Sequence, residues 1–116
     1  MSTVVVVLSI LLACVFLGSG LAKLANVDAM KKSAEQLGYS ATTSRVIGAL
    51  EVAAAAGLIV GLFWMPLGLA AAIGLTLLMI GAVYYHVRAK DAVSHIVPPG
   101  ALALLSAATA VLIAIA

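Results

Sequence analysis

A carboxylate, Glu51, interrupts a long apolar stretch of the chain and is the first side chain whose type and place suggest chemistry. It follows Arg45 by six residues, or about 9 Å along a helix, and its neighbours are Ala, Val, Leu, Ile and Gly. A charge near the bilayer centre costs about 2.5 to 3.5 kcal/mol on insertion scales, so such a residue normally faces the protein interior and has a partner or a proton. Lys23, at the end of the preceding apolar stretch, is the expected partner.

Two interpretations of Glu51 and Lys23 stay open from the sequence. In the first, a buried ion pair fixes the register of two helices, with the Lys23 ammonium reaching toward water. In the second, the same two side chains line a ligand or proton site. Both interpretations require Glu51 to face the protein interior and to meet Lys23.

A second polar group follows the third apolar stretch and contains Tyr85, His86 and Arg88, with His95 shortly after. Tyr85, His86 and Arg88 cannot all face inward, because their spacing spreads them around a helix. Tyrosine and arginine at the end of a span often anchor it at the interface, whereas a histidine is either solvated in a loop or part of a pocket. We select no catalytic residue. The candidate ligand-binding or buried polar cluster is Lys23, Glu51, His86, Tyr85 and Arg88.

Several functional classes are disfavoured by residue counts and spacing. The sequence has no HxxxH or ExxH pattern, so no metal site is predicted. Cys14 is the single cysteine, which excludes a disulfide or a CxxC redox pair within one chain. The six Lys and Arg residues divide between two short segments and form no face for nucleic acid.

Composition places the chain in a membrane. Of its 116 residues 66% are hydrophobic and 9% charged, against about a quarter charged in a soluble domain. A span needs about 20 apolar residues, so the length suffices for four. We predict an all-α, integral membrane four-helix bundle, a single domain over residues 1–116. The predicted spans are about 3–24, 45–64, 66–87 and 96–116.

Prolines mark two of the expected span ends. Pro66 disfavours helix in the residue before it, so the long apolar run around it is expected to fold as a hairpin, with Trp64 at the interface. Pro98 and Pro99 are expected in the first turn of the fourth span, where a missing N–H costs least.

The only long polar stretch lies between the first two spans. It predicts a short interfacial helix that is capped by Asp28, carries Met30 and Leu37 on its apolar side and ends at Gly38. Several hydroxyl residues could then cap the second span, and the sequence does not choose among Ser40, Thr42, Thr43 and Ser44.

Small residues mark where membrane helices approach closely. Gly57 and Gly61 form a GxxxG pair in the second span, Gly18 lies in the first, and Gly74 and Gly81 lie in the third. Packing within one bundle is the favoured interpretation, and a homo-oligomer interface is the alternative.

The order of these features resembles the DoxX-like family of small bacterial four-helix membrane proteins. The resemblance rests on GSGLAKL over residues 18–24, GALE over 48–51 with Gly57 and Gly61, and YHVR over 85–88 with Asp91. It implies an inner-membrane bundle. Some members of the family are subunits of a thiosulfate:quinone oxidoreductase, others associate with thiol or oxidative-stress enzymes, and many have no known activity.

These observations favour a membrane accessory protein that is not catalytic alone. It is expected to act as a subunit or anchor, to bind a quinone or another lipophilic molecule near its cytoplasmic face, and to work with a redox or other membrane-associated partner. The alternatives are a membrane subunit of a thiol or thiosulfate:quinone oxidoreductase complex, or a small transporter or proton pathway. The few polar groups in the outer halves of the spans argue against a continuous aqueous route.

The orientation is predicted from Lys and Arg, all of which flank or occupy the first and third connections. Short loops rich in these residues stay in the cytoplasm, so residues 25–44 and 88–95 are expected inside and both termini outside a bacterial inner membrane. Cysteine-accessibility labelling of intact cells tests this topology. A cysteine at position 40 should resist an impermeant reagent and one at position 2 should react; the reverse result means an inverted topology.

Overall fold

The computed structural model describes residues 2–115 as five α-helices and no strand. Four of the helices are long and apolar enough to cross a membrane, which confirms the predicted all-α membrane bundle. The molecule is 40 Å long along its longest axis, enough to cross a hydrocarbon core of about 30 Å. The helices are α1 (Thr3–Ala25), α2 (Asp28–Leu37), α3 (Ala41–Val60), α4 (Met65–Arg88) and α5 (Val93–Ile115).

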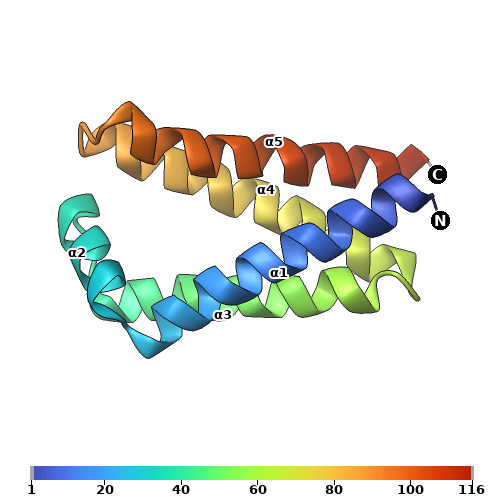
Figure 1. The fold of residues 1–116 in the computed structure, drawn as a ribbon, viewed down its shortest axis with the longest axis horizontal. Helices are drawn as coiled ribbons and strands as arrows, with labels where there is room; N and C mark the ends of the chain where they lie inside the picture. The colour runs from blue at the N-terminus through green and yellow to red at the C-terminus, as the bar shows by residue number, and fades with distance from the viewer. Residues whose placement is uncertain (1, 116) are drawn as a thin grey trace.

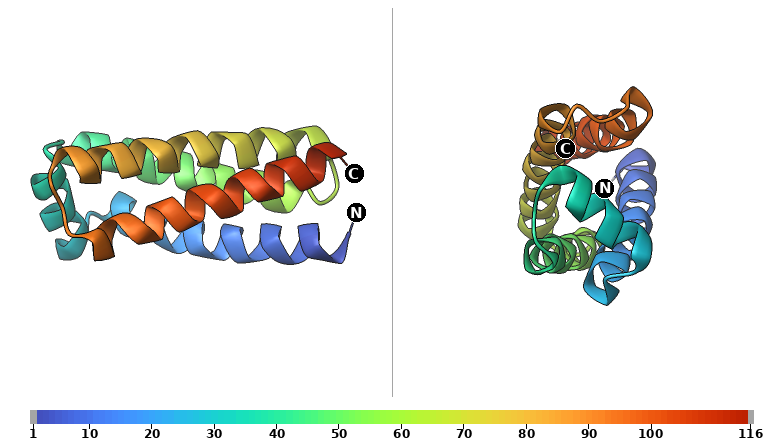
Figure 2. Two further views of the ribbon diagram at one scale, coloured as in Figure 1. Left: turned by 90° about the horizontal axis from the view of Figure 1, so that it is seen from above. Right: turned by 90° about the vertical axis from the view of Figure 1, so that its left-hand side faces the viewer.

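The four long helices form one antiparallel bundle in which α1 packs mainly on α3 and α4 mainly on α5. Contacts of α3 with α4 join the two pairs, and a smaller contact of α1 with α5 completes the bundle. Both chain ends lie beside the α3–α4 hairpin, and α2 lies across the opposite end (Figures 1 and 2). We call these the hairpin end and the α2 end.

Local signals explain where the helices begin and end. Ser2 and Ser40 cap α1 and α3, their hydroxyl groups accepting hydrogen bonds from the backbone N–H of Val5 and Thr43, which satisfies donors that a helix start leaves free. Asn26 and Gly38 follow α1 and α2 in the left-handed conformation, which favours Gly and Asn.

Some predicted boundaries differ from the structure. Val27, and not Asp28, is the residue before α2; it makes no side-chain cap, and Asp28 is the first helical residue. A carboxylate there is still favourable, because the helix dipole is positive at that end. The second span begins earlier than predicted, since Ser40 is the cap that the chain uses.

The fourth span also begins earlier than predicted. Helix α5 starts at Val93, so Pro98 and Pro99 lie beyond its first turn. Each proline removes the hydrogen bond that a helical residue donates to the carbonyl four residues before it, here those of Ser94 and His95. Both residues are exposed, so water can satisfy these carbonyls.

The closest helix contacts occur at glycines. A Cβ added to Gly20 would lie 2.7 Å from the carbonyl oxygen of Gly48, and one added to Gly48 would lie 2.7 Å from that of Gly20. At the hairpin end, a Cβ on Gly61 would overlap the backbone of Gly68, and one on Gly57 would lie 3.0 Å from Ala71. Glycine therefore permits α1 to touch α3 and α3 to touch α4 through their backbones.

The other three glycines with a predicted packing role make no such contact. A Cβ on Gly18, Gly74 or Gly81 would meet no atom within 4 Å apart from its chain neighbours and the backbone of its own helix, and the packing role of these three glycines stays a prediction. Gly81 lines a cavity at the α2 end, and Gly74 lines a hollow between α3 and α4. A missing side chain leaves space at these two positions.

The middle and the hairpin end of the bundle are filled by apolar side chains, among them Leu12, Phe16, Leu58, Ala72 and Leu75. The buried polar groups nearer the hairpin end are hydroxyls. That of Thr109 donates to the carbonyl of Leu105 in its own helix. Thr109 therefore satisfies its hydroxyl locally, whereas the buried Ser106 hydroxyl has no hydrogen-bond partner among the described residues.

The glycine contact between α1 and α3 makes a stability prediction. Gly48→Ala places a methyl group against the backbone of α1 and should destabilise the protein by about 1 to 3 kcal/mol, as overpacking does. Gly18→Ala makes the same chemical change in open space and should be neutral or stabilising, since alanine is the better helix former. Thermal unfolding in mild detergent measures both. Equal stabilities would show that the close approach of α1 and α3 is not required.

Candidate ligand-binding site

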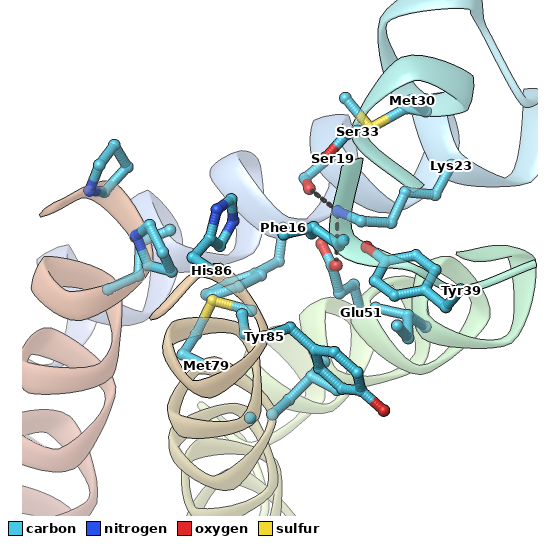
Figure 3. Close-up of a pocket in the computed structure, with 18 of the residues that line it drawn as sticks. Phe16, Ser19, Lys23, Met30, Ser33, Tyr39, Glu51, Met79, Tyr85 and His86 are labelled. Atoms are coloured by element: carbon cyan, nitrogen blue, oxygen red, sulfur yellow. Dashed lines mark hydrogen bonds and ion pairs between the residues drawn. The ribbon is translucent and has the colours of Figure 1, made fainter. Parts of the chain in front are cut away.

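A cavity of about 450 Å³ lies at the α2 end, and every helix of the bundle contributes to its wall. Ligand sites in proteins commonly measure about 300 to 1,000 Å³. Most of the lining is apolar, and the polar side chains collect on two sides (Figure 3). One side holds Lys23, Glu51 and Tyr39, and the other holds His86.

The Lys23–Glu51 ion pair forms as the sequence predicted. The Lys23 ammonium lies 2.8 Å from Oε1 of Glu51, whose side chain is only 1% exposed. The ammonium also donates a hydrogen bond of 2.7 Å to the Ser19 hydroxyl, one turn earlier in α1. The lysine side chain keeps 16% exposure, so its charge is partly hydrated while that of Glu51 is not.

The glycine contact positions this pair. Gly20 and Lys23 are three residues apart in α1, and Gly48 and Glu51 are three residues apart in α3, so each pair shares one face of its helix. A Cβ on Gly48 would lie 2.7 Å from the Cβ of Lys23. The absence of that methyl group lets the lysine lie flat against α3 and reach the carboxylate.

The carboxylate of Glu51 is not fully satisfied. Neither of its oxygens receives a hydrogen bond of good geometry from the residues that the structure describes, although both are buried; the contact of Oε1 with Lys23 satisfies only the distance of an ion pair. A buried acceptor without a hydrogen bond is costly. Glu51 lines the cavity, so the carboxylate that needs a further hydrogen-bond donor lies at the cavity wall.

Tyr39 completes this side of the cavity and was not among the predicted site residues. Its ring lies beside the ion pair in Figure 3 and packs edge-on against Tyr85, with ring centroids 5.5 Å apart. Burial, and then the charge of Glu51, raises the pKa of Tyr39. Its hydroxyl therefore remains protonated near neutral pH.

On the other side of the cavity, His86 is held by the connection between α4 and α5. Its Nδ1 lies 2.7 Å from one carboxylate oxygen of Asp91, while Nδ1 of His95 lies 2.8 Å from the other. The Ala92 backbone N–H also donates to Asp91. Hydrogen bonds from His95, His86 and Ala92 lower the pKa of Asp91 to about 2, so the carboxylate is ionised and acts only as an acceptor.

The predicted cluster is therefore divided. Lys23, Glu51, Tyr85 and His86 all line the cavity, but no hydrogen bond or ion pair joins His86 to Lys23 or Glu51 among residues 2–115. Arg88 is exposed and lies outside the cavity. Two residues beyond His86, it points to nearly the opposite side of α4.

The sequence prediction also missed the walls contributed by α2 and α5. Met30, Ser33 and Leu37 face the cavity from α2, and Pro98 and Pro99 face it from α5. The spacing of the α2 residues, three and then four positions apart, puts them on one helix face and was a usable signal. In the part of the chain that the structure describes, no three His, Cys, Asp or Glu side chains gather as metal ligands do.

The lowered pKa of Asp91 predicts that the protein becomes less stable as the pH falls. Its pKa of about 2 lies below the unfolded value of about 3.9, so its stabilising effect is present above about pH 5 and is lost as the pH falls toward 2. Asp91→Asn should remove that part of the acid dependence, measured by unfolding in detergent between pH 6 and about pH 2. Asp28→Asn, which removes a carboxylate with no described salt-bridge partner, is the control. Equal pH profiles for both variants would contradict the assignment.

Comparison with known proteins identifies the family but no single relative. A model described as the DoxX-like family matches residues 7–109. Neither the curated proteins nor the solved structures compared with the chain include a match. The family match includes all of α3 and α4, most of α1 and α5 and both residues of the ion pair, and it agrees with the resemblance seen in the sequence. The chain is therefore a membrane protein that belongs to the DoxX-like family.

Proposed function

We propose that this protein is a membrane accessory protein that binds a small lipophilic molecule, such as a quinone, in the cavity at the α2 end. The observation that carries the proposal is the buried Glu51 carboxylate, which lines the cavity and whose Oε2 has no hydrogen-bond or ion-pair partner among the described residues. A bound head group would supply it.

The surroundings of the ion pair favour ligand binding over a role in helix register alone. A pair that serves only register is best enclosed by side chains that satisfy it, because a buried charge is costly unless it is fully paired. Here a space of about 450 Å³ remains beside the pair. Apolar residues form most of the wall, which suits a molecule drawn from the bilayer.

The proposed role is binding and not catalysis by the chain alone. A carboxylate and a histidine can move protons, but the transfer of electrons requires a redox cofactor or partner. Cys14 is the one cysteine, and it lies exposed on α1, away from the cavity wall. We therefore propose a redox or other membrane-associated protein as the partner.

The proposed location is a bacterial inner membrane with the α2 end in the cytoplasm. All six Lys and Arg residues lie at or near that end, in the last turn of α1, in α2, in the first turns of α3 and around the α4–α5 connection. Trp64 and Phe63 are exposed at the hairpin end, where aromatic residues suit the opposite interface. The ligand would then be exchanged near the cytoplasmic face.

Mass spectrometry of gently solubilised protein tests the proposed binding. Wild type should retain a lipophilic molecule in near-stoichiometric amount, and the double variant Lys23→Met with Glu51→Leu should lose most of it. The double variant should fold with unchanged or raised stability, because two apolar side chains replace a buried pair without leaving a lone charge. Arg88→Gln, outside the cavity, is the control and should retain the molecule.

Two outcomes would count against the proposal. A stable double variant with its full complement of bound molecule would show that the ion pair is structural only. Wild type that retains nothing, and that gains no thermal stability from added lipophilic molecules, would show that the cavity has no such ligand.

A further inference from the structure

We infer that the ligand of this cavity carries a neutral hydroxyl group on a ring, as a phenol or the reduced (hydroquinone) form of a quinone does, and that the oxidised quinone, another ketone or an ether binds more weakly. This inference rests on the proposed function, because it specifies which lipophilic molecule the same cavity selects. It follows from the hydrogen-bond donors and acceptors that the polar side chains of the cavity wall leave unpaired.

Glu51 requires a hydrogen-bond donor. The ion pair with Lys23 at 2.8 Å is formed by an ionised carboxylate, and an ionised carboxylate only accepts hydrogen bonds. Its Oε1 contacts the Lys23 ammonium, whereas its Oε2 is buried with no partner among the described residues. A hydroxyl group supplies the missing donor, whereas a carbonyl or an ether oxygen would leave Glu51 as it is.

His86 lines the other side of the cavity. Asp91 is an acceptor, so in a neutral imidazole the Nδ1 atom that lies 2.7 Å from it carries the proton. Nε2 is then left as an acceptor. Tyr39 has a protonated hydroxyl that can donate as well as accept, so it can bind the oxygen of the same ligand hydroxyl.

The charges around Glu51 favour a neutral head group. Lys23 already provides a positive charge 2.8 Å from the carboxylate, and it would repel an amine or a quaternary ammonium. An anionic head group would meet the buried charge of Glu51 in a medium that screens it weakly. A neutral donor avoids both penalties.

The apolar wall favours a flat ring. Phe16, Tyr39 and Tyr85 contribute aromatic surfaces, and Met30 and Met79 contribute thioethers. Aromatic rings and methionine sulfur both pack favourably against an aromatic ring. Figure 3 shows these side chains around the space next to the ion pair.

The test compares two probes that differ in one donor, 4-nonylphenol and its methyl ether 4-nonylanisole. Dissociation constants are measured by isothermal titration calorimetry on the full chain in lipid nanodiscs. Wild type should bind the phenol about tenfold or more tightly than the ether, since a hydrogen bond to a charged acceptor has at least that effect. The double variant Lys23→Met with Glu51→Leu should reduce this preference to about twofold or less, and Arg88→Gln should keep it.

The outcomes separate this inference from the function on which it rests. If wild type binds both probes equally, the donor preference is wrong, but the cavity still binds lipophilic molecules. A tenfold preference that survives in the double variant would also overturn the inference, because Glu51 would not be its source. If neither probe binds wild type and purified protein retains no ligand, the proposed function itself fails.

Discussion

The backbone contact between α1 and α3 at Gly20 and Gly48 is the constraint on which the α2 end depends. Side chains at these positions would separate the helices, and Lys23 would then no longer reach Glu51. Glu51 would be left as an unpaired charge in an apolar helix, which a membrane does not tolerate well. The absence of side chains at Gly20 and Gly48 therefore allows the Glu51 carboxylate to be buried with its partner. That carboxylate makes one side of the cavity wall polar.

The cavity itself results from small or rigid residues where larger ones would fill the bundle. Gly81 leaves space on α4, while Pro98 and Pro99 present short, stiff rings from α5. Helix α2 lies across this end of the cavity and buries its own residues Ala34 and Leu37 against the bundle. Asn26 and Gly38, on either side of this helix, adopt the left-handed conformation and let the chain turn sharply into and out of it.

The sequence predicted the bundle and the ion pair well, because both follow from strong local signals. Four apolar stretches of sufficient length are typical of spans, and a carboxylate inside one of them needs a partner at a similar depth in the membrane.

The sequence predicted the cavity less well. Tyr39 and Pro98 reach it from segments distant along the chain, and a pattern within one helix cannot show which segments meet. The spacing of glycines identifies a smooth helix face, as at Gly57, but not whether a neighbour or an empty space lies against it, as at Gly81.

The packed apolar core of the bundle, which includes Leu12 and Leu75, limits how a molecule in the cavity can move. The cavity ends against this packed layer, and the hydroxyl of Thr109 beyond it is bonded within its own helix. If the proposed ligand enters beside α2, this packed layer separates it from the hairpin end of the bundle. Under the proposed function, occupancy of the cavity would then follow the concentration of the ligand in one leaflet alone.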